Sequence, residues 1–157
     1  MKWFGIFLGL MFLFSCDDKK VNPETKNVFE KEKIVEILVE SSGGDIGISD
    51  QMYITKDSTF LVYSIAIDST QDFNRAFKTD EKDWDFLMKN IDLKNFESAK
   101  DQPSRITFDG VDEIITIKTN KRKFTKMNAE KNATFDSISW KRFKTLEKFY
   151  EENKGKL

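Results

Sequence analysis

The fold is decided by residues 34–67, which read IVEILVESSGGDIGISDQMYITKDSTFLVYSIAI. In residues 34–41, Val35, Ile37 and Val39 alternate with Glu36, Leu38 and Glu40, and this period of two predicts a half-buried strand. The same pattern predicts a second strand in residues 51–56 and a third in residues 59–67. The glycine-rich residues 41–47 lie between the first two strands and can adopt positive φ angles. The stretch therefore predicts three consecutive strands joined by short turns.

Two later segments predict helices. We expect the first to begin after an N-cap at Thr79, and the second to begin at Ser137 or Ser139. Both carry apolar side chains at the spacing of one helix face, which we expect to be buried. These side chains are Trp84, Leu87, Met88 and Ile91 in the first helix, and Trp140, Phe143, Leu146 and Tyr150 in the second.

The rest of the chain adds a hairpin to the sheet. Residues 113–119 and 122–127 predict its two strands, and residues 105–108 a further short strand. Residues 68–78 are expected to be a polar connection from which two phenylalanines reach the core. The predicted fold class is α+β: a mostly antiparallel sheet of about five strands with two amphipathic helices packed on one face, a two-layer sandwich. The other sheet face is expected to be exposed to water.

Composition restricts the chemistry. The 157 residues carry a formal net charge of −1, with one cysteine and no histidine. An imidazole base, a histidine-ligated metal, an internal disulfide and a thiolate zinc cluster are therefore excluded. The near-neutral charge argues against nucleic acid as a partner. We expect no catalytic residue, metal or cofactor, and therefore no enzyme activity.

The first sixteen residues read MKWFGIFLGLMFLFSC. Lys2 precedes an apolar run over residues 3–14, which is too short to span a membrane but suits a signal peptide. Cys16 follows Leu13, Phe14 and Ser15, and the sequence then becomes polar. This pattern resembles the lipobox of bacterial lipoproteins.

The resemblance implies cleavage after residues 1–15 and attachment of acyl chains such as palmitate to Cys16. The acidic residues after Cys16 are similar to export signals of Bacteroidetes-type lipoproteins. The implied location is the cell envelope, with the outer membrane or the cell surface expected rather than the inner membrane. Residues 16–27 would then form the lipidated cysteine and a flexible tether, and residues 28–157 a single α+β domain.

Three other segments are candidates for binding. Ser42, Gly43, Gly44 and Asp45 form a loop that could contact a partner, although its glycines could also serve only the turn. This loop lacks the features of a phosphate-binding loop, because a strand rather than a helix follows it.

The lysine-rich residues 118–126 could contact anionic lipid, or could be a solvated hairpin whose lysines prevent edge-to-edge aggregation. Asp109, Asp112 and Glu113 could bind calcium, or could be a polar turn before a strand.

Residues 37–44 and 109–117 are also similar to small exported protease-inhibitor domains of the emfourin type. This resemblance implies no functional residue. The sequence as a whole predicts a non-enzymatic protein-interaction module tethered to a membrane by Cys16. The alternative is an exported domain that binds a sugar, a lipid or a metal, or that acts like a protease inhibitor.

Overall fold

The computed structural model describes residues 31–153, which form one open antiparallel sheet of six strands with helices packed against it. The predicted signal peptide, Cys16 and the tether lie outside the described residues. The α+β fold class predicted from the sequence is confirmed.

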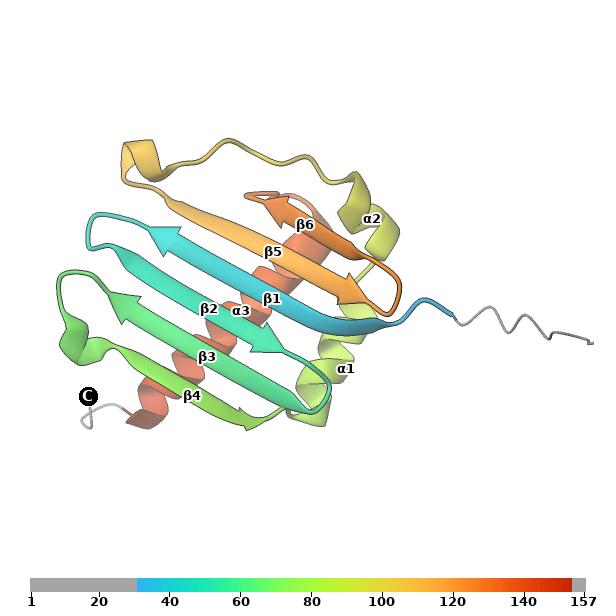
Figure 1. Ribbon diagram of the computed structural model, residues 1–157, viewed down its shortest axis with the longest axis horizontal. Coiled ribbons are helices and arrows are strands. Elements are labelled where there is room, and N and C mark those ends of the chain that lie inside the picture. The colour runs from blue at the N-terminus through green and yellow to red at the C-terminus, as the bar shows by residue number, and fades with distance from the viewer. Residues whose placement is uncertain (1–30, 154–157) are drawn as a thin grey trace, which may run out of the picture. The chain divides into compact units, whose positions relative to one another are not determined.

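The sheet has the strand order β4-β3-β2-β1-β5-β6, and every neighbouring pair is antiparallel (Figure 1). Its strands are β1 (Ile34–Gly43), β2 (Ile48–Ile54), β3 (Ser58–Ile65), β4 (Phe73–Lys78), β5 (Val111–Thr119) and β6 (Lys123–Met127). The first, second and third strands predicted from residues 34–67 are β1, β2 and β3, and the predicted hairpin is β5 and β6.

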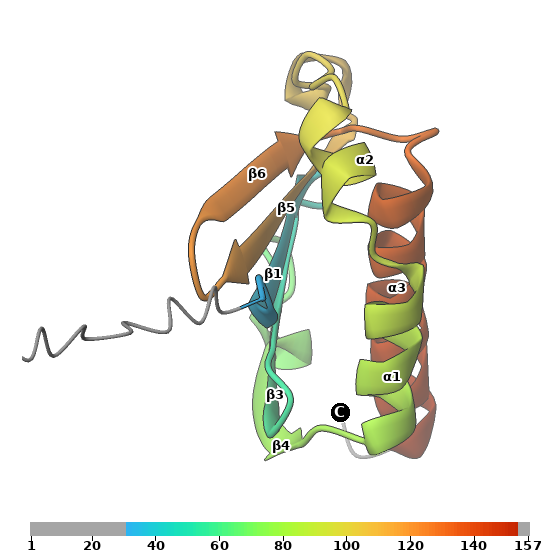
Figure 2. The same cartoon turned by 90° about the vertical axis from the view of Figure 1, so that its right-hand side faces the viewer.

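The helices lie on one side of the sheet (Figure 2). They are α1 (Glu81–Asn90), α2 (Leu93–Ser98) and α3 (Ala133–Asn153), and two short 3-10 turns are η1 (Ser69–Gln71) and η2 (Ile106–Phe108). Asp80 caps α1 by accepting a hydrogen bond from the Lys82 N–H, so the N-cap lies one residue after the predicted Thr79.

The core lies between the sheet and the helices. Alternation along the strands turns every second residue toward the helices, and Ile37 and Val39 on β1 are fully buried there. The residues paired with Ile37 and Val39 on the neighbouring strands face the same way, and the helices cover this face of the sheet. The other core side chains are Met52, Ile54, Leu61, Trp84, Leu87, Phe96, Ile115, Ile117, Phe124, Ala129, Phe135 and Ile138.

Two local predictions were wrong. Residues 68–78 were expected to be a polar connection, but Phe73–Lys78 forms the edge strand β4, paired with β3. Residues 105–108 were expected to be a strand, but the Gly110 N–H donates to the Arg105 carbonyl and closes a turn that includes η2.

Candidate interaction surface

The C-terminal helix α3 is rotated relative to the prediction. Trp140, Phe143 and Tyr150 were expected in the core, but their exposed fractions are 51%, 56% and 53%. Leu146 alone of the four predicted side chains packs against the core, and it is partly buried. The helix instead buries Phe135 and Ile138, so its exposed aromatic side chains form part of the molecular surface.

A polar row on the helix-facing side of the sheet holds α3 in this orientation. Asp50 on β2 is 2% exposed and lies opposite Ser41 on β1, which in turn lies opposite Glu113 on β5. Arg142 reaches down from α3 and pairs with both carboxylates, its nitrogens lying 2.6 Å from Asp50 Oδ1 and 3.0 Å from Glu113 Oε1. The guanidinium therefore faces the sheet, and the next residue, Phe143, lies on the flank of α3, where its side chain is half-exposed.

Glu113 is held on its other side by α3 as well, because the Ser139 hydroxyl donates to its carboxylate. Burial raises the pKa of Glu113 above its ordinary value, against the opposing effects of the Ser139 hydrogen bond and the Arg142 charge. Among the described residues no buried side-chain nitrogen or oxygen lacks a partner. The row is thus a fully paired anchor for α3 rather than an open reactive site.

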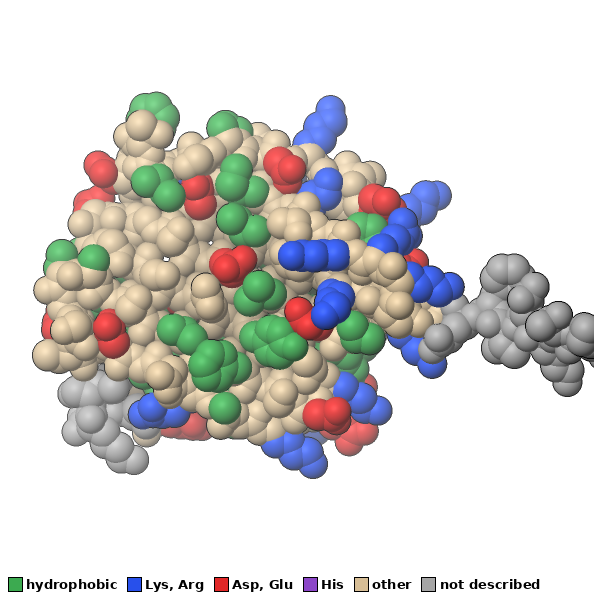
Figure 3. All heavy atoms as spheres, viewed as in Figure 1, with side chains coloured by type: hydrophobic (Ala, Val, Ile, Leu, Met, Phe, Trp, Pro, Cys, Tyr) green, Lys and Arg blue, Asp and Glu red, His purple; other side chains and the backbone are tan. Residues whose placement is uncertain are grey.

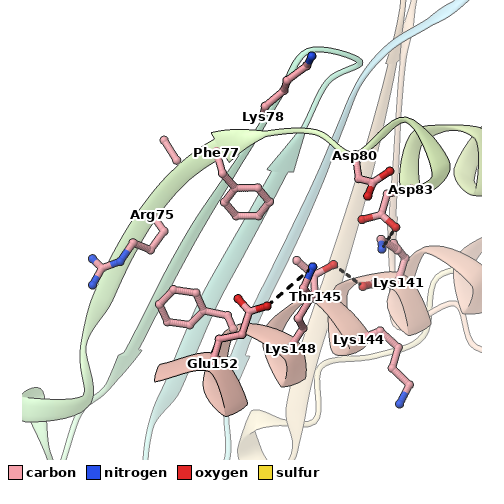
Figure 4. A pocket seen from close by; sticks show the side chains of 12 residues that line it. Arg75, Phe77, Lys78, Asp80, Asp83, Lys141, Lys144, Thr145, Lys148 and Glu152 are labelled. Atoms are coloured by element: carbon pink, nitrogen blue, oxygen red, sulfur yellow. Dashed lines mark hydrogen bonds and ion pairs between the residues drawn. The ribbon is translucent and has the colours of Figure 1, made fainter. Parts of the chain in front are cut away.

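The first groove beside α3 runs between that helix and strand β4 (Figure 4). We call it the β4 groove. Its volume is about 650 Å³, and its apolar lining includes Phe77 from β4 and Phe149 from α3. Phe149 stacks on Phe73 of the same strand with ring centroids 4.2 Å apart, which fixes the helix against this edge of the sheet.

Five cationic side chains and three acidic ones line the β4 groove. Lys141 pairs with Asp83, and Lys148 lies 3.9 Å from Glu152 (Figure 4). Lys144 pairs with Glu147, which is not part of the lining. The remaining two cations, from β4, form no ion pair with any of the described residues. The cations are Arg75, Lys78, Lys141, Lys144 and Lys148, and the acids are Asp80, Asp83 and Glu152.

Strand β4 also presents an open backbone edge. The Thr79 N–H donates to the Asp57 carbonyl directly opposite, and hydrogen-bonded pairs alternate along an antiparallel ladder. The N–H and C=O groups of Asn74 and Ala76 therefore point away from β3. The Asn74 carbonyl accepts a hydrogen bond from the Arg75 guanidinium at 2.7 Å, and this is a side-chain contact that a competing strand could displace.

At the opposite edge of the sheet, a loop covers the Met127 end of β6. The Gln102 N–H donates to the Met127 carbonyl of β6, and the Met127 N–H donates to Asp101. Lys126 is tied to the same loop through the Ala99 carbonyl. The loop thus covers the outward backbone groups of Met127 on β6, whereas β4 presents those of Ala76 to another chain directly beside the β4 groove.

The second groove lies on the other side of α3, and we call it the apolar groove. Its volume is about 410 Å³. Ile48, Tyr63 and Phe73 line it from the sheet, and Phe143 and Tyr150 line it from α3. The paired Asp50 and Arg142 also border it, so a mostly apolar cavity has one buried ion pair in its wall.

The residues predicted to contact a partner lie elsewhere. Ser42 and Gly43 end β1, and Gly44 and Asp45 continue into the turn toward β2. The predicted positive φ angles are confirmed, at 126° for Gly43 and 75° for Gly44. These conformations account for the glycines by turn geometry, and the role of the loop in binding stays a prediction.

The acidic cluster does not come together as one site. Asp112 accepts hydrogen bonds from the Ser104 hydroxyl and the Arg105 N–H, whereas Glu113 faces α3 on the opposite side of the sheet. No group of three acidic or cysteine side chains in residues 31–153 is arranged to hold a metal ion. Cys16, the predicted lipidation site, lies outside the described residues.

Sequence reasoning missed both grooves. The signal for β4 was weak, because five of its six residues are exposed and only Phe73 and Phe77 mark its inner face. The alternation of Phe73, Arg75 and Phe77 with smaller or polar residues could have revealed the strand.

Comparison with protein-family models matches no family, and comparison with curated protein sequences finds no significant relative. Within the described part of the chain, no helix has the length and apolar character needed to cross a membrane.

Proposed function

We propose that this chain is a lipid-anchored, non-enzymatic protein-interaction module of the bacterial cell envelope. The anchor is Cys16, on the strength of the lipobox-like sequence around it. The interaction surface is the open edge of β4 together with the β4 groove. A non-enzymatic role is supported by the composition, since the chain has no histidine and one cysteine.

The observation that carries the interaction role is that the backbone groups of Asn74 and Ala76 point away from β3, beside a groove that is rich in cationic and aromatic side chains. An extended segment can add a strand to such an edge, and its alternate side chains then enter the adjoining groove. Apolar side chains of the segment would contact Phe77 and Phe149, and the acidic ones that alternate with them would meet Lys78 on the other face of β4. The preferred partner is thus an extended segment that alternates apolar and acidic residues.

The experiment tests the edge directly. Ala76→Pro removes the outward N–H without removing a bond to β3, because the Ala76 N–H does not face that strand. Ala76→Val is the matched control, since it adds a comparable side chain and keeps the N–H. A photoreactive residue at position 74, on the same strand but not at the substituted position, is introduced into the tagged chain in intact cells and should crosslink one dominant protein.

The expected result is that Ala76→Pro abolishes recovery of that protein while Ala76→Val retains it, with equal melting temperatures for both variants. Recovery of the same protein with Ala76→Pro would contradict binding at the β4 edge. The anchor is tested separately by Cys16→Ser, which should release a folded domain from the membrane fraction. Retention of this variant in membranes after a high-salt wash would contradict lipidation.

A second candidate function is supported by the apolar groove. Its volume of about 410 Å³ lies in the range of small-molecule sites, and Phe143 and Tyr150 offer aromatic contact area. A small apolar ligand would raise the melting temperature of the chain. Phe143→Ser should abolish this rise, whereas a rise that survives the substitution would place the ligand elsewhere.

A further inference from the structure

The start of the described domain is fixed against the β5–β6 hairpin. The Lys33 N–H donates to the Asn120 side chain, and the Asn120 N–H donates to the Lys33 carbonyl, both at 2.9 Å. Two hydrogen bonds thus join the first residues of the domain to the turn between β5 and β6. The point at which the chain from Cys16 reaches the domain therefore has a defined place in the fold.

Positive charge is concentrated around this point. Five exposed lysines surround it and form no ion pair with the described residues, and we call this surface the basic end. Figure 3 shows Lys and Arg side chains gathered at this end of the domain. The five residues are Lys31, Lys33, Lys94, Lys121 and Lys123.

Three nearby glutamates are already paired with other cations, and a nearby aspartate caps a helix. Glu32 and Glu97 pair with Arg122, and Glu36 pairs with Lys118. Asp92 caps α2 by accepting from the N–H groups of Lys94 and Asn95. The five lysines therefore give the surface a net positive charge that the local acids do not cancel.

Part of the basic end is a shallow groove of about 710 Å³ with a mixed lining. Lys31, Lys33 and Lys94 supply its cationic groups, and Met88 and Leu93 are among its apolar ones. A surface that combines cationic groups with partly exposed apolar side chains is suited to the headgroup region of a bilayer.

We propose that the basic end is a second membrane contact, which lies against anionic phospholipid headgroups. The orientation of this contact rests on the proposed lipid anchor, because Lys31 lies 15 positions after Cys16 and an extended chain of that length spans at most about 50 Å. The charge of the surface does not depend on the anchor. Strand β1 has ten residues and so extends about 30 Å from the basic end. When the basic end lies against the membrane, the apolar groove is therefore directed away from it.

The test uses the chain from residue 16 onward with Cys16→Ser, so that no lipid contributes to binding. Co-sedimentation is measured with vesicles of phosphatidylcholine, and with the same vesicles containing phosphatidylglycerol. The double variant Lys121→Gln/Lys123→Gln removes two lysines of the basic end. The matched control is Lys144→Gln/Lys148→Gln, which removes the same charge from α3, next to the Phe149–Phe73 contact at the far end of the sheet.

We expect binding only to the vesicles that contain phosphatidylglycerol, with a decrease as salt is added. Each lysine near an anionic surface contributes on the order of fivefold in partition, so the Lys121/Lys123 variant should bind roughly 25-fold more weakly. The control variant should lose much less. Melting curves exclude unfolding as the cause of any loss.

Three outcomes would overturn the proposal. The first is no binding that depends on phosphatidylglycerol, and the second is an equal loss in the two double variants, which would indicate an effect of net charge alone. The third is equally tight binding of the chain to a DNA duplex, which would assign the surface to polyanions in general. None of these results bears on Cys16 lipidation, because the chain tested has no lipid.

Discussion

The guanidinium of Arg142 and the carboxylate of Asp50 form a bidentate pair, with Nε 2.6 Å from Oδ1 and Nη2 2.7 Å from Oδ2. The two residues are 92 positions apart in the sequence, on α3 and β2. A pair of this geometry is directional, so it fixes the rotation of α3 about its own axis as well as its distance from the sheet. Both grooves beside α3 depend on that rotation.

Removing one partner of this pair should be costly. Arg142→Met leaves the Asp50 carboxylate buried without a counter-charge, and we expect the free energy of unfolding to fall by about 3–5 kcal/mol. Urea unfolding at neutral pH measures the change. Lys148→Met is the control, because the pair between Lys148 and Glu152 is exposed and should contribute less than about 1 kcal/mol.

The double variant Arg142→Met/Asp50→Leu should recover part of the loss, since it removes the unpaired charge and keeps apolar volume. If Arg142→Met were no more destabilising than Lys148→Met, the ion pair would not anchor the helix.

The exposed aromatic residues of α3 give a second prediction. Trp140 contacts the Phe86 ring at a centroid distance of 5.3 Å but is half exposed, so Trp140→Ala should cost only about 1 kcal/mol. Phe135 is fully buried, and Phe135→Ala should cost about 3–5 kcal/mol. Thermal or urea unfolding of the two variants compares them directly. Equal losses in the free energy of unfolding would indicate that Trp140 is buried in the core, which would contradict the observed rotation of α3.

The rotation of α3 shows where the sequence pattern was insufficient. Apolar spacing selected Trp140, Phe143 and Tyr150 for the core, because a charged residue such as Arg142 counts as polar in that pattern. In the structure Arg142 occupies a core-facing position, since Asp50 on the sheet supplies a buried counter-charge. Long-range pairing of this kind cannot be read from local periodicity.

The start of α3 was also misplaced, and this contributed to the error. The helix begins at Ala133, and the Asn132 side chain accepts a hydrogen bond from the Phe135 N–H as an N-cap does. A predicted start at Ser137 or Ser139 left Phe135 outside the helix, although it is among the largest fully buried side chains. Asn132 was the local signal that could have corrected the boundary.

The central strands were predictable for the opposite reason. Ile37 and Val39 on β1, and Met52 and Ile54 on β2, recur at every second position and are all buried. Strand β4 lies at an edge and buries little, so its periodicity was weaker. The fold class therefore followed from the sequence, whereas the surface proposed to bind a partner did not.

The glycine turn between β1 and β2 gives a third prediction. A Cβ atom at position 43 would lie 2.3 Å from the carbonyl oxygen of Gly110, and the φ of Gly43 is 126°. Gly43→Ala should therefore destabilise the chain by roughly 2–3 kcal/mol. Gly44→Ala is the control: its φ of 75° is also positive, but the nearest atom to an added Cβ is at 3.5 Å, and the loss should be about 1 kcal/mol.

Urea unfolding of both variants measures the difference. Equal effects at the two positions would indicate that backbone conformation alone, and not the close approach of Gly110, accounts for the glycine at position 43.

The last prediction concerns acid stability and Asp112. The Ser104 hydroxyl at 2.6 Å, the Arg105 N–H and the Asn128 amide all donate to its carboxylate, and together they lower the pKa of Asp112 below its ordinary value. The unfolded chain then binds this proton more readily than the folded one. The stabilisation is fully present above the ordinary aspartate pKa of about 3.9, and it is lost as the pH falls through the lower folded value.

Asp112→Asn should therefore be less stable than the wild type at neutral pH, and the gap between the two should narrow as the pH falls to about 3. Ser104→Ala, which removes the donor that contributes most, should show the same trend to a smaller degree. Urea unfolding of the three chains at both pH values gives the comparison. A stability gap between Asp112→Asn and the wild type that does not change with pH would contradict the prediction, because the lost stabilisation would then not depend on ionisation of the carboxylate.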